Sequence, residues 1–141
     1  MTEEEIKMGL NKPVGFPTAK LLKEKEFDKY CTSGYTESGD VYLHQGGQEP
    51  VKNGHGYHEG RNYNGGEFYC SAPTIADVVM WIYEKHGIWI EVRFFQAYKL
   101  FYFELSNVNN LKGMTSKGEN HFKSPTEAYE AGIEHTLNHI I

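Results

Sequence analysis

The chain lacks a long apolar run: none of its 141 residues belongs to a stretch long enough to span a bilayer, which takes about 18 to 20 apolar residues. Its first five residues, Met-Thr-Glu-Glu-Glu, are acidic, whereas a secretory signal is basic and then apolar. We therefore expect a protein of the cytoplasm, with no membrane partner.

Cysteine is also scarce, because the chain contains only Cys31 and Cys70. They lie far apart and form no CxxC pair, which favours free thiols over a disulfide. Neither lies in the local signature of a catalytic cysteine.

An excess of basic charge is missing, since 14 lysines and arginines face 19 aspartates and glutamates, giving a net charge of −5. Nucleic-acid binders use a basic stripe to neutralise phosphates and release counterions. Lysines at 20, 23 and 25 alternate with Glu24 and Glu26, a pattern typical of a solvated helix face. The charge therefore disfavours a nucleic-acid partner.

Signatures of common enzymes are absent too. The sequence has no GxSxG, no P-loop GxxxxGK[ST], no Rossmann GxGxxG after a strand and no HxE with PCxxC pattern. We therefore lean towards a protein that is not an enzyme and has no cofactor.

The remaining pattern indicates one α+β domain over residues 1–141. Residues 1–15 are expected to form a loosely held arm, followed by a short helix over about 17–26. "VYLH" is a short strand candidate, and residues 46–66 form a glycine-rich loop without periodicity.

The clearest helix is predicted in "SAPTIADVVMWIYEKHG". Thr74 and Asp77 form a possible capping box, and Gly87 is expected to end the helix. Its apolar side chains recur at helical spacing and share one face: Ile75, Val78, Val79, Ile82, Tyr83 and His86.

"IWIEVRFF" and "LFYFELS", joined by "QAYK", predict a β-hairpin. Strand alternation places Trp89, Glu91, Arg93 and Phe95 on one face, and Ile88, Ile90, Val92 and Phe94 on the other. The outer face is then covered by the glycine-rich loop or presented to a partner.

A last helix is predicted from "SPTEAYEAGIEHTLNHII", where Ser124, Pro125 and Glu127 occupy N-cap, N1 and N3. Its apolar stripe is Tyr129, Ile133, Leu137 and Ile140, with Ala128 and Gly132 allowing close packing. The predicted fold class is thus α+β: a small antiparallel sheet with a β-hairpin, covered by two amphipathic helices, plus a short N-terminal helix.

Three blocks of the chain, "FPTAKLLKEKEFD", "YCSAPTIADVVMWIYEKHGIWIEV" and "SPTEAYEAGIEHTLNHII", resemble a family of short uncharacterised proteins from phages and prophages of gut bacteria. The three blocks match in order and cover about two thirds of the chain. The resemblance implies a phage accessory protein of the host cell cytoplasm that acts on host defence, on host enzymes, or without a detectable effect. It implies no activity, cofactor or catalytic residue. The insert at 46–66 is not part of the family pattern.

The segment "NGHGYHEGRNYNGGEFYC" at 53–70 is the main candidate site. Its tyrosines could stack a planar ligand, and its arginine could pair with a phosphate or carboxylate. The leading hypothesis is therefore a binding protein for an anionic, nucleotide-like molecule or for a host protein. The candidate ligand-binding residues are His55, Tyr57, His58, Arg61 and Tyr63 of the loop, with Trp89 and Arg93 of the outer hairpin face.

A metal-dependent hydrolase is an alternative, with His55 and His58 as ligands and either His44 or Glu59 as the third. No HExxH is present, and the glycines on every side would make a soft cage, so no metal is expected. His135 and His139 are spaced i, i+4 on the last helix and could also share a metal, although such histidines more often suit a helix C-terminus.

Two further alternatives remain open. The aromatic hairpin face could form a homo-oligomer, and an oligomer interface could itself build a ligand site. The aromatic residues of the 53–70 segment could instead only fill the underside of a long loop whose glycines make its turns.

Overall fold

The computed structural model describes residues 9–29, 31, 33–43, 69–109, 116–117 and 121–141, with the backbone alone for 41–43 and 116–117. The chain groups into two compact units. Unit 1 contains Met1–Lys12 and Ile75–Ile141, and unit 2 contains Pro13–Thr74.

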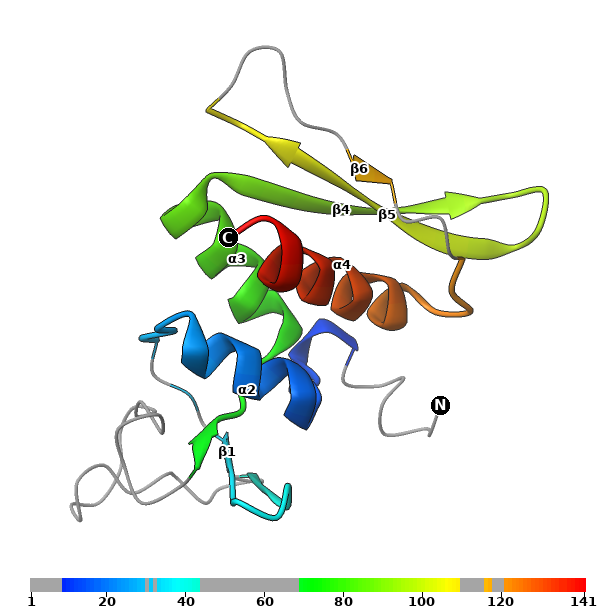
Figure 1. Cartoon of the computed structure of the whole chain (residues 1–141). Coiled ribbons are helices and arrows are strands. Elements are labelled where there is room, and N and C mark those ends of the chain that lie inside the picture. The colour runs from blue at the N-terminus through cyan, green and yellow to red at the C-terminus, as the bar shows by residue number, and fades with distance from the viewer. Residues whose placement is uncertain (1–8, 30, 32, 44–68, 110–115, 118–120) are drawn as a thin grey trace. The chain divides into compact units, whose positions relative to one another are not determined.

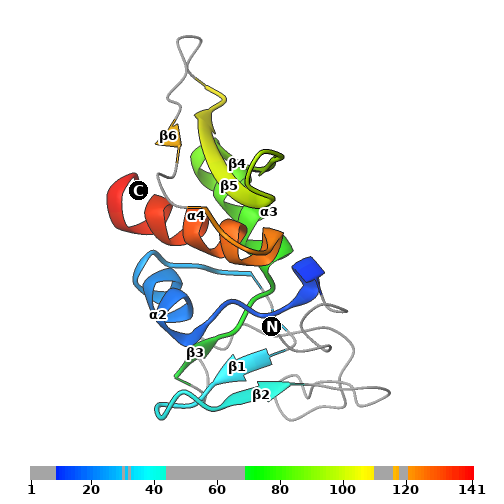
Figure 2. The same ribbon diagram turned by 90° about the vertical axis from the view of Figure 1, so that its right-hand side faces the viewer.

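Unit 2 is a short helix with a three-stranded antiparallel sheet (Figures 1 and 2). The helix, α2, spans Phe16–Glu24 and confirms the predicted N-terminal helix, with Pro17 in its first turn. The strands are β1 (Ser33–Tyr35), β2 (Val41–Leu43) and β3 (Cys70–Ser71), in the order β2-β1-β3. Among the described residues of unit 2, the buried apolar side chains are Val14, Ala19, Leu22, Phe27, Cys31, Tyr35, Cys70 and Ala72.

Residues 9–15 are more ordered than the predicted loose arm. A 3-10 helix, η1, spans Gly9–Asn11, and the Lys12 carbonyl accepts from the N–H of Ile75 at 3.0 Å. Val14 is fully buried and donates its N–H to the Pro73 carbonyl at 2.9 Å. The hydrogen bonds and the burial of Val14 hold this segment; residues 1–8 lie outside the described residues.

Unit 1 is an antiparallel sheet with two helices on one face (Figure 1). Its helices are α3 (Ile75–His86) and α4 (Pro125–His139). Its strands are β4 (Ile88–Phe95), β5 (Leu100–Asn107) and β6 (Ser116–Lys117), in the order β4-β5-β6. The α+β class, the hairpin and the two covering helices are confirmed.

The α3–β4 connection is a single glycine. Gly87 has φ +68°, and its N–H donates to the Tyr83 carbonyl at 2.9 Å, which closes the last turn of α3. Because the left-handed backbone costs a glycine nothing sterically, the chain can turn straight into β4. The predicted helix stop is therefore correct.

The core of unit 1 lies between the inner face of the hairpin and the helices. Ile90 faces Leu105 across the hairpin, Val92 faces Phe103, and Ile90, Leu105 and Phe103 are buried. Phe94 continues the same strand face, as predicted, but it is 52% exposed. Figure 1 shows the reason: the turn end of the hairpin extends past α4.

Helix α4 begins as predicted, since the Ser124 Oγ accepts the N–H of Glu127 at 3.2 Å. Its buried stripe is rotated from the predicted one, because Tyr129 and Ile140 are only half-buried. Gly132 lets the helix approach the sheet closely, which turns the smaller residues inward. The buried residues of α4 are Thr126, Ala128, Gly132, Ile133, Thr136 and Leu137.

Candidate functional site

Most of the predicted binding residues lie outside the described residues. This applies to the ligand candidates of the loop and to the alternative metal ligands: His44, His55, Tyr57, His58, Glu59, Arg61 and Tyr63. Trp89 and Arg93 are described, and both lie on β4 of unit 1. The described part of the predicted site therefore lies on the hairpin of unit 1.

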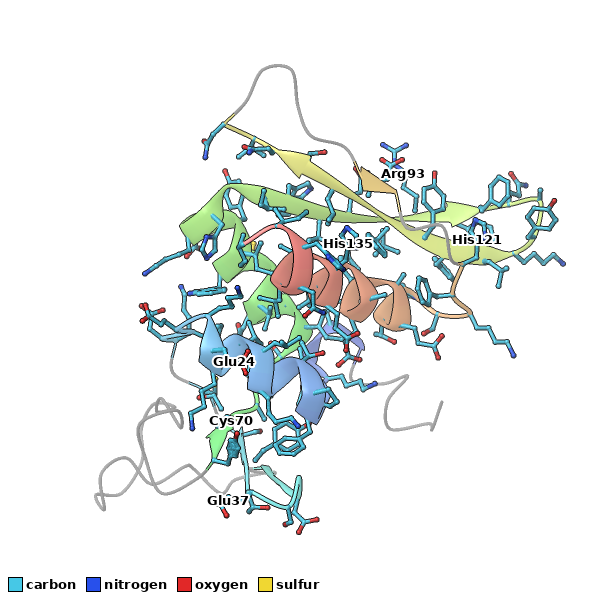
Figure 3. The ribbon with its side chains drawn as sticks, viewed as in Figure 1. Glu24, Glu37, Cys70, Arg93, His121 and His135 are labelled. Carbon is cyan, nitrogen blue, oxygen red and sulfur yellow. The ribbon has the colours of Figure 1, made fainter. Side chains whose placement is uncertain are left out.

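Arg93 projects from the sheet on the side away from α4 (Figure 3). Its Nε lies 3.4 Å from the Glu91 carboxylate and 3.2 Å from that of Glu104. Glu91 and Glu104 face each other directly across the hairpin, so two like charges share one arginine. The guanidinium is thus already paired, and the three side chains together carry a net negative charge.

Trp89 lies four residues from Arg93 along β4, on the same face of the strand. Its side chain is 39% exposed, and its indole contacts the Tyr83 ring edge-on, with centroids 5.6 Å apart. Four residues of strand separate the two Cα atoms by about 13 Å, so the structure does not bring Trp89 and Arg93 together as one ligand pocket.

A group of four aromatic side chains gathers instead at the turn of the hairpin. The Phe95 ring stacks on His121 with an interplanar angle of 14° and centroids 5.5 Å apart. Tyr98 and Tyr102 contact the same two rings. We call this group the hairpin-tip cluster: Phe95, Tyr98, Tyr102 and His121.

The hairpin-tip cluster is presented to solvent, since Tyr98 is 68% exposed and Phe95 is 38% exposed. His121 is exposed as well and lies at the turn end of the hairpin (Figure 3). The backbone holds it there, because Phe122 exchanges two hydrogen bonds with Phe101 of β5, at 2.7 and 2.8 Å. The cluster is therefore held by two separate segments of the chain.

Sequence patterns identify Phe95 as an outer-face residue but miss the other three members. Tyr98 lies in the turn "QAYK", where no periodicity applies, and His121 comes from a polar stretch. Tyr102 can be found from the register, because it faces Arg93 across the hairpin. The useful signal is the density of aromatic residues around the turn.

Unit 2 contains a separate aromatic group beneath two lysines. Phe16 contacts Tyr35 and Tyr69, with ring centroids 5.1 and 5.9 Å away. The Lys20 Nζ lies 4.8 Å from the Phe16 ring centroid, and the Lys23 Nζ lies 4.4 Å from that of Tyr69. These distances place both ammonium groups over ring faces. The Lys23 ammonium also donates a hydrogen bond to the Tyr69 carbonyl at 2.7 Å.

The two cysteines of unit 2 are free, as predicted, and both are buried. Burial raises the pKa of the Cys70 thiol, and the positive charges of Lys23 and Lys20 only partly oppose the rise. A thiol with a raised pKa stays protonated near neutral pH, and the protonated form is a poor nucleophile. Cys70 (Figure 3) is thus a core side chain rather than an activated one.

In the part of the chain that the structure describes, no group of three or more His, Cys, Asp or Glu side chains could hold a metal ion. The rings of His135 and His139 lie 4.9 Å apart by centroid, and His135 also contacts Phe103. Two imidazoles fall short of the three or four ligands that zinc needs. This pair is therefore not a metal site by itself.

Across the described segments, no helix is both long and apolar enough to cross a membrane. Comparison with protein-family models, with curated proteins and with solved structures returns no match.

Proposed function

We propose that this chain is a non-enzymatic binding protein that docks on another protein through the hairpin-tip cluster. The observation that supports the proposal is the exposure of Tyr98 and Phe95 at the end of a hairpin. Aromatic side chains carry much of the binding free energy of protein interfaces, since each buries a large area and has few rotatable bonds. A rigid hairpin presents them without a large ordering cost.

A protein partner fits the outer hairpin face better than an anionic small molecule. Arg93, the predicted anion-binding group of this face, is already paired with Glu91 and Glu104. An incoming phosphate at Arg93 would lie close to two carboxylates and be repelled by both. An aromatic anchor for a protein pocket meets no such repulsion.

The resemblance to phage and prophage proteins supports a setting within this proposal. In that setting the partner is a protein of the bacterial host, for example a component of its defence. The resemblance rests on the three sequence blocks alone, and the hairpin-tip cluster does not depend on it.

Photo-crosslinking tests the proposal directly. With benzoyl-phenylalanine at position 98 and the full chain produced in its bacterial host, we expect one discrete cross-linked protein. The same probe at Met80, which is 42% exposed on α3, serves as the matched control and should not capture that protein. Mass spectrometry of the cross-linked species then identifies the partner.

Binding to the purified partner provides the second half of the test. The variant Phe95→Ser/Tyr98→Ser/His121→Ser should weaken binding at least about 100-fold, as expected when aromatic hot spots are lost. Met80→Ser should leave it unchanged. Equal binding by the triple variant and the wild type would overturn the proposal.

A second proposal is that the 53–70 segment binds an anionic, nucleotide-like molecule through residues that lie outside the described ones. Lys23 supports this proposal indirectly, because its ammonium donates a hydrogen bond to the carbonyl of Tyr69, the first described residue after the loop. Native mass spectrometry of untagged protein from its host should then show a small molecule that is lost on denaturation. Tyr57→Ala/His58→Ala/Arg61→Ala should abolish that mass and leave unfolding within about 1 kcal/mol of wild type.

A further inference from the structure

One edge of the unit 1 sheet is open among the described residues. The sheet order is β4-β5-β6, so β4 is paired with β5 on one side only. Strand β5 therefore lies between β4 and β6. An exposed strand edge offers unpaired N–H and C=O groups to another strand.

The hydrogen-bond alternation shows which groups β4 presents. Phe101 exchanges two bonds with Phe122, so its polar backbone groups point away from β4. Phe94, directly opposite Phe101, therefore points its own groups away from β5. The Gly87 carbonyl accepts from Val108, which fits the same alternation. The outward-pointing residues are Ile88, Ile90, Val92 and Phe94.

We propose that β4 pairs antiparallel with β4 of a second copy of this chain, about a two-fold axis through Val92. The two three-stranded sheets then join into one continuous sheet. Val92 faces the second copy's Val92 as a hydrogen-bonded pair. This proposal rests on the sheet edge and does not depend on the proposed docking function.

Charge selects this register. A two-fold axis at Val92 places Glu91 opposite the second copy's Arg93, and Arg93 opposite the second copy's Glu91. These are non-hydrogen-bonded pairs, whose Cα atoms lie about 4.5 Å apart, so the side chains can meet. An axis one residue earlier opposes Glu91 to itself, and an axis one residue later opposes Arg93 to itself. Both neighbouring registers are repulsive.

Within the monomer two carboxylates repel each other across the hairpin, and this pairing reduces that repulsion. Within one copy, Glu91 lies directly across from Glu104, and Arg93 serves both carboxylates. The second copy supplies another arginine on the open side of Glu91. Like charges opposite each other destabilise a sheet, and an opposite charge across the new edge offsets this.

The same register accounts for two exposed apolar side chains. Phe94, 52% exposed, comes to lie opposite the second copy's Ile90 on the helix side of the sheet. On the other side, Trp89 lies opposite the second copy's Phe95, a member of its hairpin-tip cluster. Aromatic pairs of this kind stabilise facing strands.

The first measurement is the mass of the full-length protein in solution by light scattering over a dilution series. We expect a dimer with twice the 16.2 kDa mass of one chain, dissociating on dilution. A monomer at every concentration would overturn the proposal.

A charge swap tests the register. Glu91→Arg alone and Arg93→Glu alone each place two like-charged pairs across the edge, and each should weaken self-association at least about tenfold. Mixed in equal amounts, the two variants should form a heterodimer as stable as the wild-type dimer, because every facing pair is again opposite in charge. A merely structural defect would not be rescued by mixing.

Two controls complete the design. Glu37→Arg makes the same charge change on an exposed side chain of unit 2 and should leave self-association unchanged. Val92→Pro removes an N–H that points to the open edge and not to β5, so it should abolish the dimer while circular dichroism stays native. A dimer that survives Val92→Pro, or variants that do not recombine on mixing, would refute pairing at β4.

Discussion

The backbone N–H of Phe27 donates to the carbonyl oxygen of Leu22 at 3.0 Å, and Glu26 between them has φ +63°. With the bond from the Glu26 N–H to the Lys23 carbonyl at 3.1 Å, this is a Schellman motif that closes α2. Both Phe27 and Leu22 are buried, which supplies the apolar contact of the motif. A glycine usually occupies the left-handed position, and here it is a glutamate.

Glu26→Gly should therefore stabilise the protein by about 0.5–1 kcal/mol, because the left-handed strain of a residue with a Cβ is removed. Lys25→Gly is the matched control: Lys25 has φ −91°, so glycine there only adds flexibility and should destabilise. Urea unfolding midpoints of the two variants should move in opposite directions. Movement in the same direction would contradict the strain at Glu26.

Gly87→Ala should destabilise the protein by at least about 1–2 kcal/mol, from its left-handed backbone alone. A Cβ at this position would also lie against the side-chain amide nitrogen of Asn109. Adding Asn109→Ala to Gly87→Ala should then recover the stability lost through overlap with Asn109. The loss caused by the left-handed backbone should remain. Thermal unfolding of the single and double variants measures the two losses separately. If the double variant regained the full wild-type stability, backbone strain at position 87 would be absent.

Gly132→Val should cost about 1–3 kcal/mol through overpacking. A Cβ on Gly132 would lie 3.1 Å from the Ile90 Cγ2 and 3.2 Å from the Phe103 Cγ. Ala131→Val places the same side chain on the half-buried neighbour and measures the helix-propensity term alone. Equal losses of unfolding free energy in the two variants would mean that α4 can move away from the sheet.

The raised pKa of Cys70 predicts a pH dependence of stability. Above the ordinary thiol pKa of 9.0 the unfolded chain loses this proton while the folded chain keeps it, so unfolding is favoured as the pH rises. Wild type should therefore lose stability more steeply than Cys70→Ala above that pH, and equally below it. Urea midpoints from pH 7 to 10 check this, and parallel curves would contradict it.

Much of the fold follows from local patterns in the sequence. Helix α3 has a one-sided apolar face and a glycine stop, and α4 has Ser124 at its N-cap, so both are predictable without tertiary information. The hairpin follows from strand alternation. These elements are local, because each pattern lies within a stretch of chain close to the length of the element itself.

The exposure of Phe94 and the membership of Tyr98 and His121 in one cluster could not be predicted in this way. Phe94 continues a regular alternation, but the turn end of the hairpin extends past α4, so Phe94 is exposed. How far α4 covers the hairpin depends on the packing of segments that are distant in the chain. His121 meets Phe95 through a bridge between Phe122 and β5. No periodicity relates residues so far apart in the chain.

The bond between Lys12 and Ile75, with the bridge between Pro13 and Thr74, brings the two ends of unit 2 side by side. Unit 2 is in effect an insertion whose two ends meet, as in domains that tolerate transplantation. A tight turn joining Lys12 to Ile75 would preserve the chain path of unit 1. Unit 1 is thus interrupted in sequence by unit 2, yet its two chain segments stay joined by a hydrogen bond at the point of interruption.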